Sequence, residues 1–263
     1  MNRETCYRCF RPKAHCLCDS IRPMPTRSRF VFLMHPKEFK HEKAATGRLT
    51  HLCLAGSEIH VGIGFDGHEA VQALIQDPRN FPVLLYPGRT ALDLSRNGLK
   101  RDELGGRRLV IFLVDATWSL ARKMVRLSPS LQRLPRILFM PSQPSRFVIK
   151  QQPHASCLST LEATHELLTL LADLGLDEYR DPGQLLRVFA LMQDFQIRCA
   201  TDPARGGYRR SPYRAPGERT PLRGRSGARR LKALGFPVPV LSRTSNDYSP
   251  KVGPGGKTVV PGG

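Results

Sequence analysis

The sequence lacks long apolar runs and an N-terminal secretory pattern. It has no stretch of about 18 consecutive apolar residues, so we expect no membrane-spanning helix. The first ten residues, MNRETCYRCF, do not show the basic-then-apolar order of a secretory signal. We therefore expect a cytoplasmic, reducing location, in which disulfides are rare.

Acidic residues are also scarce. The chain has 22 Asp and Glu against 41 Lys and Arg, and its formal net charge is +19. A charge of this size and sign concentrates polyanions around the protein and speeds their encounter with it. Nucleic acid and anionic membrane surfaces are the partner classes that it favours.

Apolar residues are plentiful enough for one substantial core, at 40% of 263 residues. We predict three regions: a cysteine-rich segment at 1–24, a globular α/β domain at 25–199 that is large enough to carry a catalytic site, and a disordered basic tail at 200–263. The tail is rich in Arg, Gly and Pro, with 13 Lys or Arg against 3 Asp or Glu. Tyr208 and Tyr213 lie among its arginines and can stack on bases, which favours an RNA-binding arm over a solubilising extension.

Short β-branched runs alternate with helical periodicity across the middle region. The pattern predicts strands at 29–36, 58–64, 81–88, 108–115 and 136–142, and helices at 41–55, 67–77, 118–127, 159–175 and 181–199. Such alternation is typical of an α/β fold with a mostly parallel sheet and helices on both faces. Ligands in these folds bind at the carboxyl ends of the strands.

The first cysteines form a cluster, CYRCFRPKAHCLC. Cys6 and Cys9 make one close pair, and Cys16 and Cys18 make a second pair after a short turn. Two such pairs suit tetrahedral zinc, and four thiolates leave no open position for metal catalysis. The alternatives are ordinary or disulfide-bonded cysteines, or His15 as a substitute ligand. We predict a structural zinc knuckle.

Three predicted strands end in polar or turn residues: His35, Tyr86 and Asp115. Because the ends of parallel strands share one edge, these side chains are expected to converge. Each also has a plain structural interpretation. Asp115 is equally suited to cap the helix that begins near Trp118. His35 is equally suited to a structural place at the sheet edge, with its ring hydrogen-bonded.

The segment CLSTLEATHELL has the pattern of a helix start. Ser159 with Glu162 three residues later is a capping-box signature. The same helix start offers backbone N–H groups to a ligand carboxylate. The two roles are compatible.

Several motifs together carry a resemblance to a known family. The chain resembles the DTW-domain family, which is named for the Asp-x-Thr-Trp motif found here at 115–118. The other landmarks follow in order: the cysteine cluster, HPKE at 35–38, TGRL at 46–49, LLYPG at 84–88, FVIKQQP at 147–153 and LSTLEA at 158–163. Ala44-Ala45, Phe147 and Lys150 depart from the usual residues, and the changes at 147 and 150 remove a hydroxyl and a planar guanidinium.

This resemblance implies a SPOUT-like fold, in which a deep trefoil knot holds S-adenosylmethionine. The activity it implies is a tRNA-uridine aminocarboxypropyltransferase. The enzyme moves the 3-amino-3-carboxypropyl group to N3 of a uridine, in the bacterial type within the variable loop, and releases 5′-methylthioadenosine. A monomer that acts on tRNA, without a membrane partner, is expected.

The resemblance also implies roles for individual residues. Asp115 is expected to take the N3 proton, with a pKa raised by desolvation, while Thr117 holds the loop and Trp118 either stacks on a base or anchors the helix in the core. Contacts to S-adenosylmethionine are expected from Leu85, Tyr86, Pro87, Gly88, Met140, Pro141, Ser142, Leu158, Ser159, Thr160 and Glu162. Contacts to RNA are expected from His35, Lys37, Arg48, Arg89, Arg122, Lys123, Arg126, Arg146 and Lys150.

Two other functions compete with this hypothesis. One is a SPOUT-class RNA methyltransferase, which would add a methyl group instead. The other is a zinc-knuckle RNA-binding protein without catalysis. Neither accounts for the joint presence of the Asp-x-Thr-Trp and Ser-Thr-Leu-Glu-Ala motifs.

Overall fold

A computed structural model describes residues 4–41, 45–150 and 157–202 of the chain. Within these residues, no helix combines the length and the apolar character that crossing a membrane requires. The predicted tail from residue 203 onward lies outside the described residues. So do residues 151–156, between the last strand and the next helix, and the predicted knot therefore stays a prediction.

The described chain alternates strands and helices. The strands are β1 (Met24–Pro25), β2 (Arg29–Met34), β3 (Leu54–Ala55), β4 (Glu58–Val61), β5 (Asn80–Leu85), β6 (Leu92–Asp93), β7 (Arg108–Asp115) and β8 (Arg136–Leu138). The α-helices are α1 (Pro36–His41), α2 (Thr46–Cys53), α3 (Glu69–Gln76), α4 (Leu94–Asn97), α5 (Trp118–Arg126), α6 (Pro129–Gln132), α7 (Thr160–Asp173) and α8 (Pro182–Thr201). Three 3-10 helices are η1 (Lys13–His15), η2 (Cys18–Ser20) and η3 (Arg101–Leu104).

Six strands form one sheet in the order β4-β2-β7-β5-β8-β6, and every pair in it is parallel. All five predicted strands are present. The short strands β1 and β3 pair in a separate two-stranded sheet, and these two-residue strands were beyond what periodicity can detect. β7 lies between β2 and β5, so its backbone is hydrogen-bonded on both sides.

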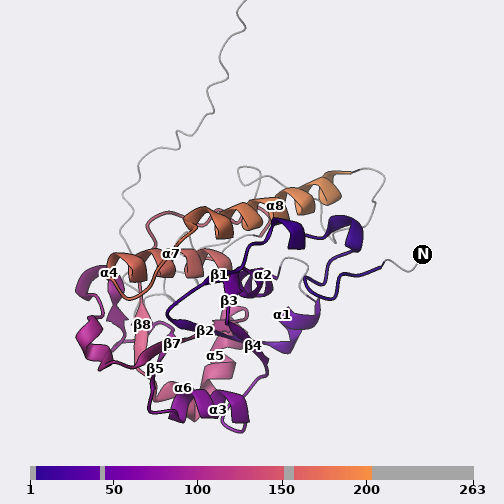
Figure 1. The fold of residues 1–263 in the computed structure, drawn as a ribbon. Coiled ribbons are helices and arrows are strands. Elements are labelled where there is room, and N and C mark those ends of the chain that lie inside the picture. The colour runs from indigo at the N-terminus through magenta and orange to yellow at the C-terminus, as the bar shows by residue number, and fades with distance from the viewer. Residues whose placement is uncertain (1–3, 42–44, 151–156, 203–263) are drawn as a thin grey trace, which may run out of the picture.

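Helices cover both faces of the sheet, as predicted (Figure 1). Alternate residues of β7 point to opposite faces, which is the strand period of two. Leu109, Ile111 and Leu113 join a cluster with residues of α2, α7 and α8. Val110 and Phe112 join a second cluster with residues of α3, α5 and α6. The central strand is therefore buried on both sides, which explains its unbroken apolar sequence.

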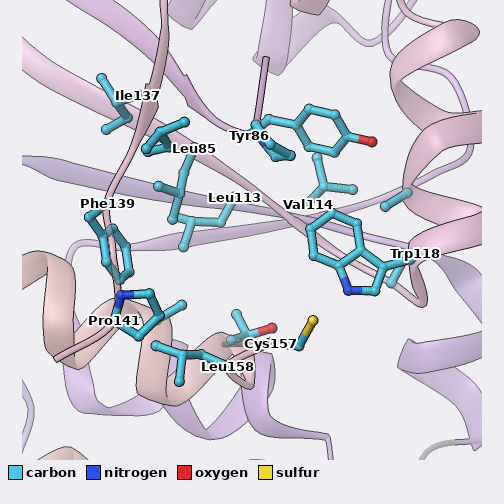
Figure 2. Close-up of a pocket in the computed structure, with 16 residues that line it drawn as sticks. Leu85, Tyr86, Leu113, Val114, Trp118, Ile137, Phe139, Pro141, Cys157 and Leu158 are labelled. Atoms are coloured by element: carbon cyan, nitrogen blue, oxygen red, sulfur yellow. The ribbon is translucent and has the colours of Figure 1, made fainter. Parts of the chain in front are cut away.

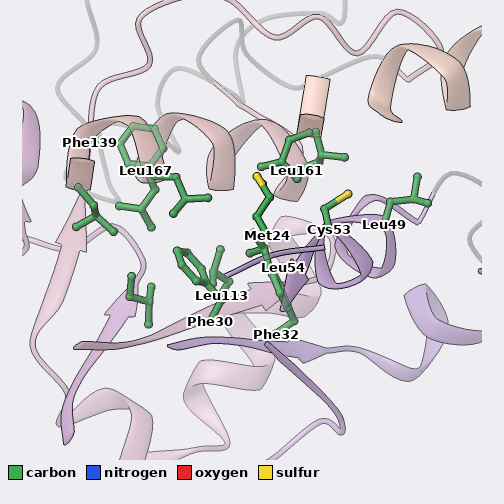
Figure 3. Close-up of a cluster of buried hydrophobic side chains, with 14 of the residues drawn as sticks. Met24, Phe30, Phe32, Leu49, Cys53, Leu54, Leu113, Phe139, Leu161 and Leu167 are labelled. Carbon is green, nitrogen blue, oxygen red and sulfur yellow. The ribbon is translucent and has the colours of Figure 1, made fainter. Parts of the chain in front are cut away.

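Figure 3 shows the first of these clusters, beneath α7. Phe30 and Phe32 of β2 have no exposed surface, and Leu161 and Leu167 of α7 are equally buried. The predicted helix at 41–55 is shorter in the structure, because α2 gives way to β3 at Leu54. This packing fixes the start of α2 and the start of α7 against the carboxyl end of β7.

Candidate active site

A pocket opens at the carboxyl ends of the parallel strands. Its cavity volume is about 180 Å³, and its mouth opens to solvent. Its walls come from the ends of β5, β7 and β8, the first turns of α5 and the approach to α7. The lining residues are Leu85, Tyr86, Pro87, Leu113, Val114, Ala116, Trp118, Ala121, Ile137, Leu138, Phe139, Pro141, Cys157, Leu158, Thr160 and Ala163.

Aromatic rings form one side of this pocket. Figure 2 shows Tyr86 and Trp118 facing Phe139 and Pro141 across the open space. The ring centroids of Tyr86 and Trp118 lie 6.3 Å apart with their planes tilted by 53°. Trp118 also packs against the second core cluster, so it serves both as pocket wall and as helix anchor.

Asp115 ends β7 beside the pocket without lining it. Its carboxylate Oδ1 accepts a hydrogen bond of 2.7 Å from the hydroxyl of Thr160, which does line the pocket. The side chain is 8% exposed. The N-cap of α5 is Thr117, and Asp115 therefore reaches across to the first residue of α7 instead of serving as that cap.

Gly47 forms the other side of the Asp115 environment. A Cβ atom at position 47 would lie 2.0 Å from Oδ2 of Asp115 and 3.1 Å from Cε of Met34. Gly47 sits in the first turn of α2, so the carboxylate lies between the starts of two helices, where positive dipole ends favour an anion. No role was predicted for Gly47 from the sequence, although it belongs to the TGRL motif.

His35 and Asp115 converge, as predicted from their strand ends. The backbone N–H of His35 donates to the carbonyl oxygen of Asp115 at 3.0 Å. The Nδ1 atom of His35 accepts a hydrogen bond of 3.1 Å from the backbone N–H of Lys37. Burial lowers the pKa of His35, and the positive charges of Lys37 and Lys123 lower it further. The imidazole therefore stays neutral near pH 7.

The predicted cofactor residues divide into two groups. Leu85, Tyr86, Pro87, Pro141, Leu158 and Thr160 line the pocket, whereas Gly88, Met140, Ser142, Ser159 and Glu162 are not among its lining residues. Ser142 instead donates through its hydroxyl to Glu166 at 2.7 Å, and the backbone N–H of Met140 donates to the hydroxyl of Ser95.

Glu162 is held by a network of its own. Its carboxylate accepts from the backbone and hydroxyl of Ser159, which completes the predicted capping box of α7. It also accepts from the hydroxyl of Ser145 at 2.9 Å and from the backbone N–H of Arg146 at 2.6 Å. With these donors, Glu162 ties the loop after β8 to the start of α7.

The predicted RNA contacts also divide by exposure. The exposed ones are Lys37, Arg89, Arg122, Lys123, Arg126, Arg146 and Lys150. Three of them, Arg122, Lys123 and Arg126, lie on α5 directly after Trp118. His35 and Arg48 are each 5% exposed and do not form part of this cationic surface.

The four N-terminal cysteines come together as the spacing predicted; Cys6, Cys9, Cys16 and Cys18 are called the cysteine knuckle below. Their sulfur atoms all lie within 4.8 Å of one another. The Sγ atoms of Cys6 and Cys18 are 3.8 Å apart, and those of Cys9 and Cys16 are 3.7 Å apart. Tetrahedral zinc with Zn–S bonds of about 2.3 Å requires S···S edges of about 3.8 Å. Disulfide-bonded sulfurs are only about 2.05 Å apart, so this geometry fits zinc.

The backbone around the knuckle also favours thiolates. Hydrogen bonds from the N–H groups of Cys9 and Arg8 lower the pKa of Cys6 to about 6, whereas burial and the neighbouring sulfurs raise the pKa of Cys18. The N–H of Cys18 donates to Sγ of Cys16 at 3.4 Å. Such N–H···S contacts stabilise the deprotonated sulfur that a metal needs.

Comparison with protein families matches residues 3–197 of the chain to the DTW domain. The chain is 31% identical over 207 residues to tRNA-uridine aminocarboxypropyltransferase 2 of Mus musculus, covering 76% of this chain and 68% of the relative. It is 30% identical over 176 residues to the protein of the same name in Drosophila melanogaster, covering 64% and 67%. It is 26% identical over 221 residues to tRNA-uridine aminocarboxypropyltransferase A of Arabidopsis thaliana, covering 74% and 82%. No solved structure gives a significant match.

Proposed function

The chain belongs to the DTW domain family, and on that premise we propose that it transfers the 3-amino-3-carboxypropyl group of S-adenosylmethionine to N3 of a uridine in tRNA. The observation that carries this proposal is the pocket at the strand ends, which brings Trp118 of the Asp-x-Thr-Trp motif and Thr160 of the Ser-Thr-Leu-Glu-Ala motif into one lining. Asp115 lies behind Thr160, whose hydroxyl donates a hydrogen bond to its carboxylate.

The pocket walls suit the donor chemically. The lining is mainly apolar, with Leu85 and Leu158 among its residues, and it offers an apolar surface to the flat adenine ring. The faces of Tyr86 and Trp118 attract cations, and the sulfonium of the donor is a cation. A SPOUT-like knot, with the loops after β5 and β8 as its cofactor loops, is part of the proposal.

Asp115 is the proposed base. Uridine N3 carries a proton and is a weak nucleophile until that proton leaves, so a carboxylate in hydrogen-bond reach of the N–H raises its reactivity. The Thr160 hydroxyl fixes the carboxylate from one side, and Gly47 leaves it room on the other. The uracil edge is proposed to reach the small part of Asp115 that stays exposed.

The bonds then change in a balanced way. The N3–Cγ bond forms as the Cγ–S bond breaks, and the electron pair of that bond stays on sulfur. The leaving group is the neutral thioether 5′-methylthioadenosine. The N3 proton goes to Asp115 and then to solvent.

The tRNA is proposed to lie over α5 and the neighbouring cationic surface. Arg122, Lys123 and Arg126 are exposed next to the pocket, at a place where phosphates flanking the target uridine would pass. The net charge of +19 attracts the polyanion over longer distances. The variable loop of tRNA is the proposed target region, and the protein is proposed to act as a cytoplasmic monomer.

The cysteine knuckle is proposed to hold one Zn²⁺ through four thiolates. Bound zinc supplies a structural crosslink, because four sulfur ligands leave no position for substrate or water. The knuckle holds the N-terminal segment in a fixed fold, since a segment this short buries little apolar surface by itself.

Nucleoside mass spectrometry tests the proposed reaction. Unmodified tRNA is incubated with the protein and S-adenosylmethionine, digested to nucleosides and compared with a reaction that lacks the protein. The expected product is a uridine that has gained one aminocarboxypropyl group. A uridine that has gained a methyl group instead would assign the chain to the methyltransferases, and unchanged nucleosides would leave only RNA binding.

A further inference from the structure

Arg48 is a buried arginine that lies between two aromatic rings. Its guanidinium carbon is 3.7 Å from the ring centroid of Phe10 and 4.3 Å from that of Phe39. The residue is only 5% exposed, whereas arginines are almost never fully buried unless they are paired with an anion. A buried guanidinium of this kind calls for an anionic partner.

The hydrogen bonds of Arg48 do not supply that partner. One terminal nitrogen, Nη2, donates to the carbonyl oxygen of Phe39 at 2.9 Å. The other, Nη1, is buried and has no hydrogen-bond partner among the described residues. In the same part of the chain, no carboxylate forms an ion pair with Arg48. The structure therefore contains a buried donor without its acceptor.

The cysteine knuckle is a source of negative charge for Arg48. Phe10, which covers the guanidinium, directly follows Cys9, and Cys9 is itself only 5% exposed. Phe10 has a φ of 56°, in the left-handed region that non-glycine residues rarely adopt. Burial lowers the pKa of Arg48, and the charge of the Cys9 sulfur acts in the opposite direction.

We propose that Arg48 is the charge partner of the zinc-loaded cysteine knuckle and binds that centre to α2. Zn²⁺ with four thiolates carries a net charge of −2, and a cationic neighbour stabilises it most on the side of Cys9, the buried member of the four. The inference rests on the proposed zinc occupancy, but it does not depend on the proposed transferase reaction. Outer-shell partners of this kind change metal affinity by roughly 10- to 100-fold.

The position of Arg48 gives this contact a consequence for the active site. Arg48 follows Gly47 in α2, and Gly47 lies against the carboxylate of Asp115. This helical turn thus lies against the Phe10 ring, next to Cys9, through Arg48, and against the carboxylate of Asp115 through Gly47. Zinc loading holds this turn in place.

Zinc affinity is the direct test. The full-length protein is purified with zinc, and its dissociation constant is measured by competition with a chromophoric chelator. We expect Arg48→Met to weaken zinc binding by about 10- to 100-fold. The matched control is Arg8→Met, which removes the same charge from an exposed position in the knuckle itself and should leave the affinity within about twofold of the wild type.

Two further measurements separate a role of Arg48 at the zinc centre from a role in folding or in RNA binding. Arg48→Lys retains the charge but loses the planar guanidinium, so its zinc affinity should lie between those of the wild type and Arg48→Met. If Arg48→Met does not fold, the comparison of Arg48→Lys with the wild type is the test. Affinity for tRNA is measured on the same zinc-loaded proteins. Equal zinc affinities in the wild type, Arg8→Met and the Arg48 variants would overturn the proposal, as would a loss of tRNA binding with zinc affinity unchanged.

Discussion

At the scale of single residues, Asp115 is the residue on which the proposed reaction depends most. The Thr160 hydroxyl and the glycine at position 47 hold this carboxylate in a defined place, and the residue is largely shielded from bulk water. A shielded carboxylate behind a pocket wall is suited to accept a proton from a bound base. Trp118 borders the same pocket from the other side of β7.

Substitution of Asp115 by Asn should abolish most of the transfer. Asn keeps the volume of the side chain and can still accept the Thr160 hydrogen bond, but it is not a base. We expect the single-turnover transfer rate to fall by about 10²- to 10⁴-fold, with binding of S-adenosylmethionine within about threefold of the wild type by calorimetry. Asp194→Asn, at an exposed position of α8, is the control, and an Asp115→Asn enzyme as fast as that control would disprove the assignment.

Gly47→Ala should disturb the same carboxylate from the opposite side. The added Cβ would meet Oδ2 of Asp115 at 2.0 Å, so either the carboxylate or the first turn of α2 must move. We expect a loss of about 1–3 kcal/mol in the free energy of unfolding, measured by urea denaturation, together with a lower transfer rate. Gly67→Ala places its Cβ in open space and should change neither quantity; a Gly47→Ala protein that matches it would show that α2 does not confine Asp115.

Much of the residue-level site could be predicted from the sequence, but not all of it. The strand-end rule correctly brought His35 and Asp115 together. Gly47 was missed because its role is a close approach between segments 68 positions apart, which no local pattern encodes. Arg48 was expected to contact RNA, whereas packing between Phe10 and Phe39 buries it, and no local sequence pattern shows that packing.

At the scale of elements, α7 packs in the core and places its first residue, Thr160, against Asp115. Its capping box was predicted from Ser159 and Glu162, and the structure contains both of its hydrogen bonds. The sequence did not predict that Glu162 also binds the Ser145 hydroxyl and the Arg146 backbone, because that contact requires the tertiary path of the loop after β8. The start of α7 is thereby fixed where Thr160 must meet Asp115.

Ser159→Ala should therefore weaken α7 at its start. The substitution removes the side-chain acceptor for the backbone N–H of Glu162 and one donor to its carboxylate. We expect the free energy of unfolding to fall by about 1–2 kcal/mol in urea denaturation. Ser119→Ala, at an exposed position of α5, should cost less than about 0.5 kcal/mol, and equal losses in the two variants would argue against a stabilising cap.

At the scale of the whole molecule, the described residues form two helical layers around a six-stranded, fully parallel sheet. The strand runs were predicted well because β7 and its neighbours are apolar throughout, which is typical of strands covered on both faces. Two-residue strands such as β1 and β6 were not predicted, since pairing partners and not periodicity create them. Partly buried histidines are distributed over several elements of this fold.

The stability of the whole protein should depend on pH through these histidines. Burial lowers the pKa values of His51, His60 and His165 below the ordinary 6.5. Above pH 6.5 both the folded and the unfolded states leave these groups neutral, and below it the unfolded state binds protons that the folded state does not. We expect the melting temperature to fall as the pH is lowered from 7.5 to 5.5.

His165 offers a variant that checks this origin. Its Nδ1 lies 2.8 Å from the hydroxyl of Tyr179, and Gln can replace that hydrogen bond without titrating. The melting temperature of His165→Gln should therefore fall less steeply with decreasing pH than that of the wild type. A parallel decrease in the two proteins would show that other groups control the acid sensitivity.

The central claim is that the chain transfers the aminocarboxypropyl group and not the methyl group. Two parallel reactions with tRNA test it, one with S-adenosylmethionine labelled in the carboxyl carbon and one with the donor labelled in the methyl carbon. We expect the carboxyl label to enter the tRNA and the methyl label to leave in 5′-methylthioadenosine. Methyl label on the tRNA, or no label from either donor, would contradict it.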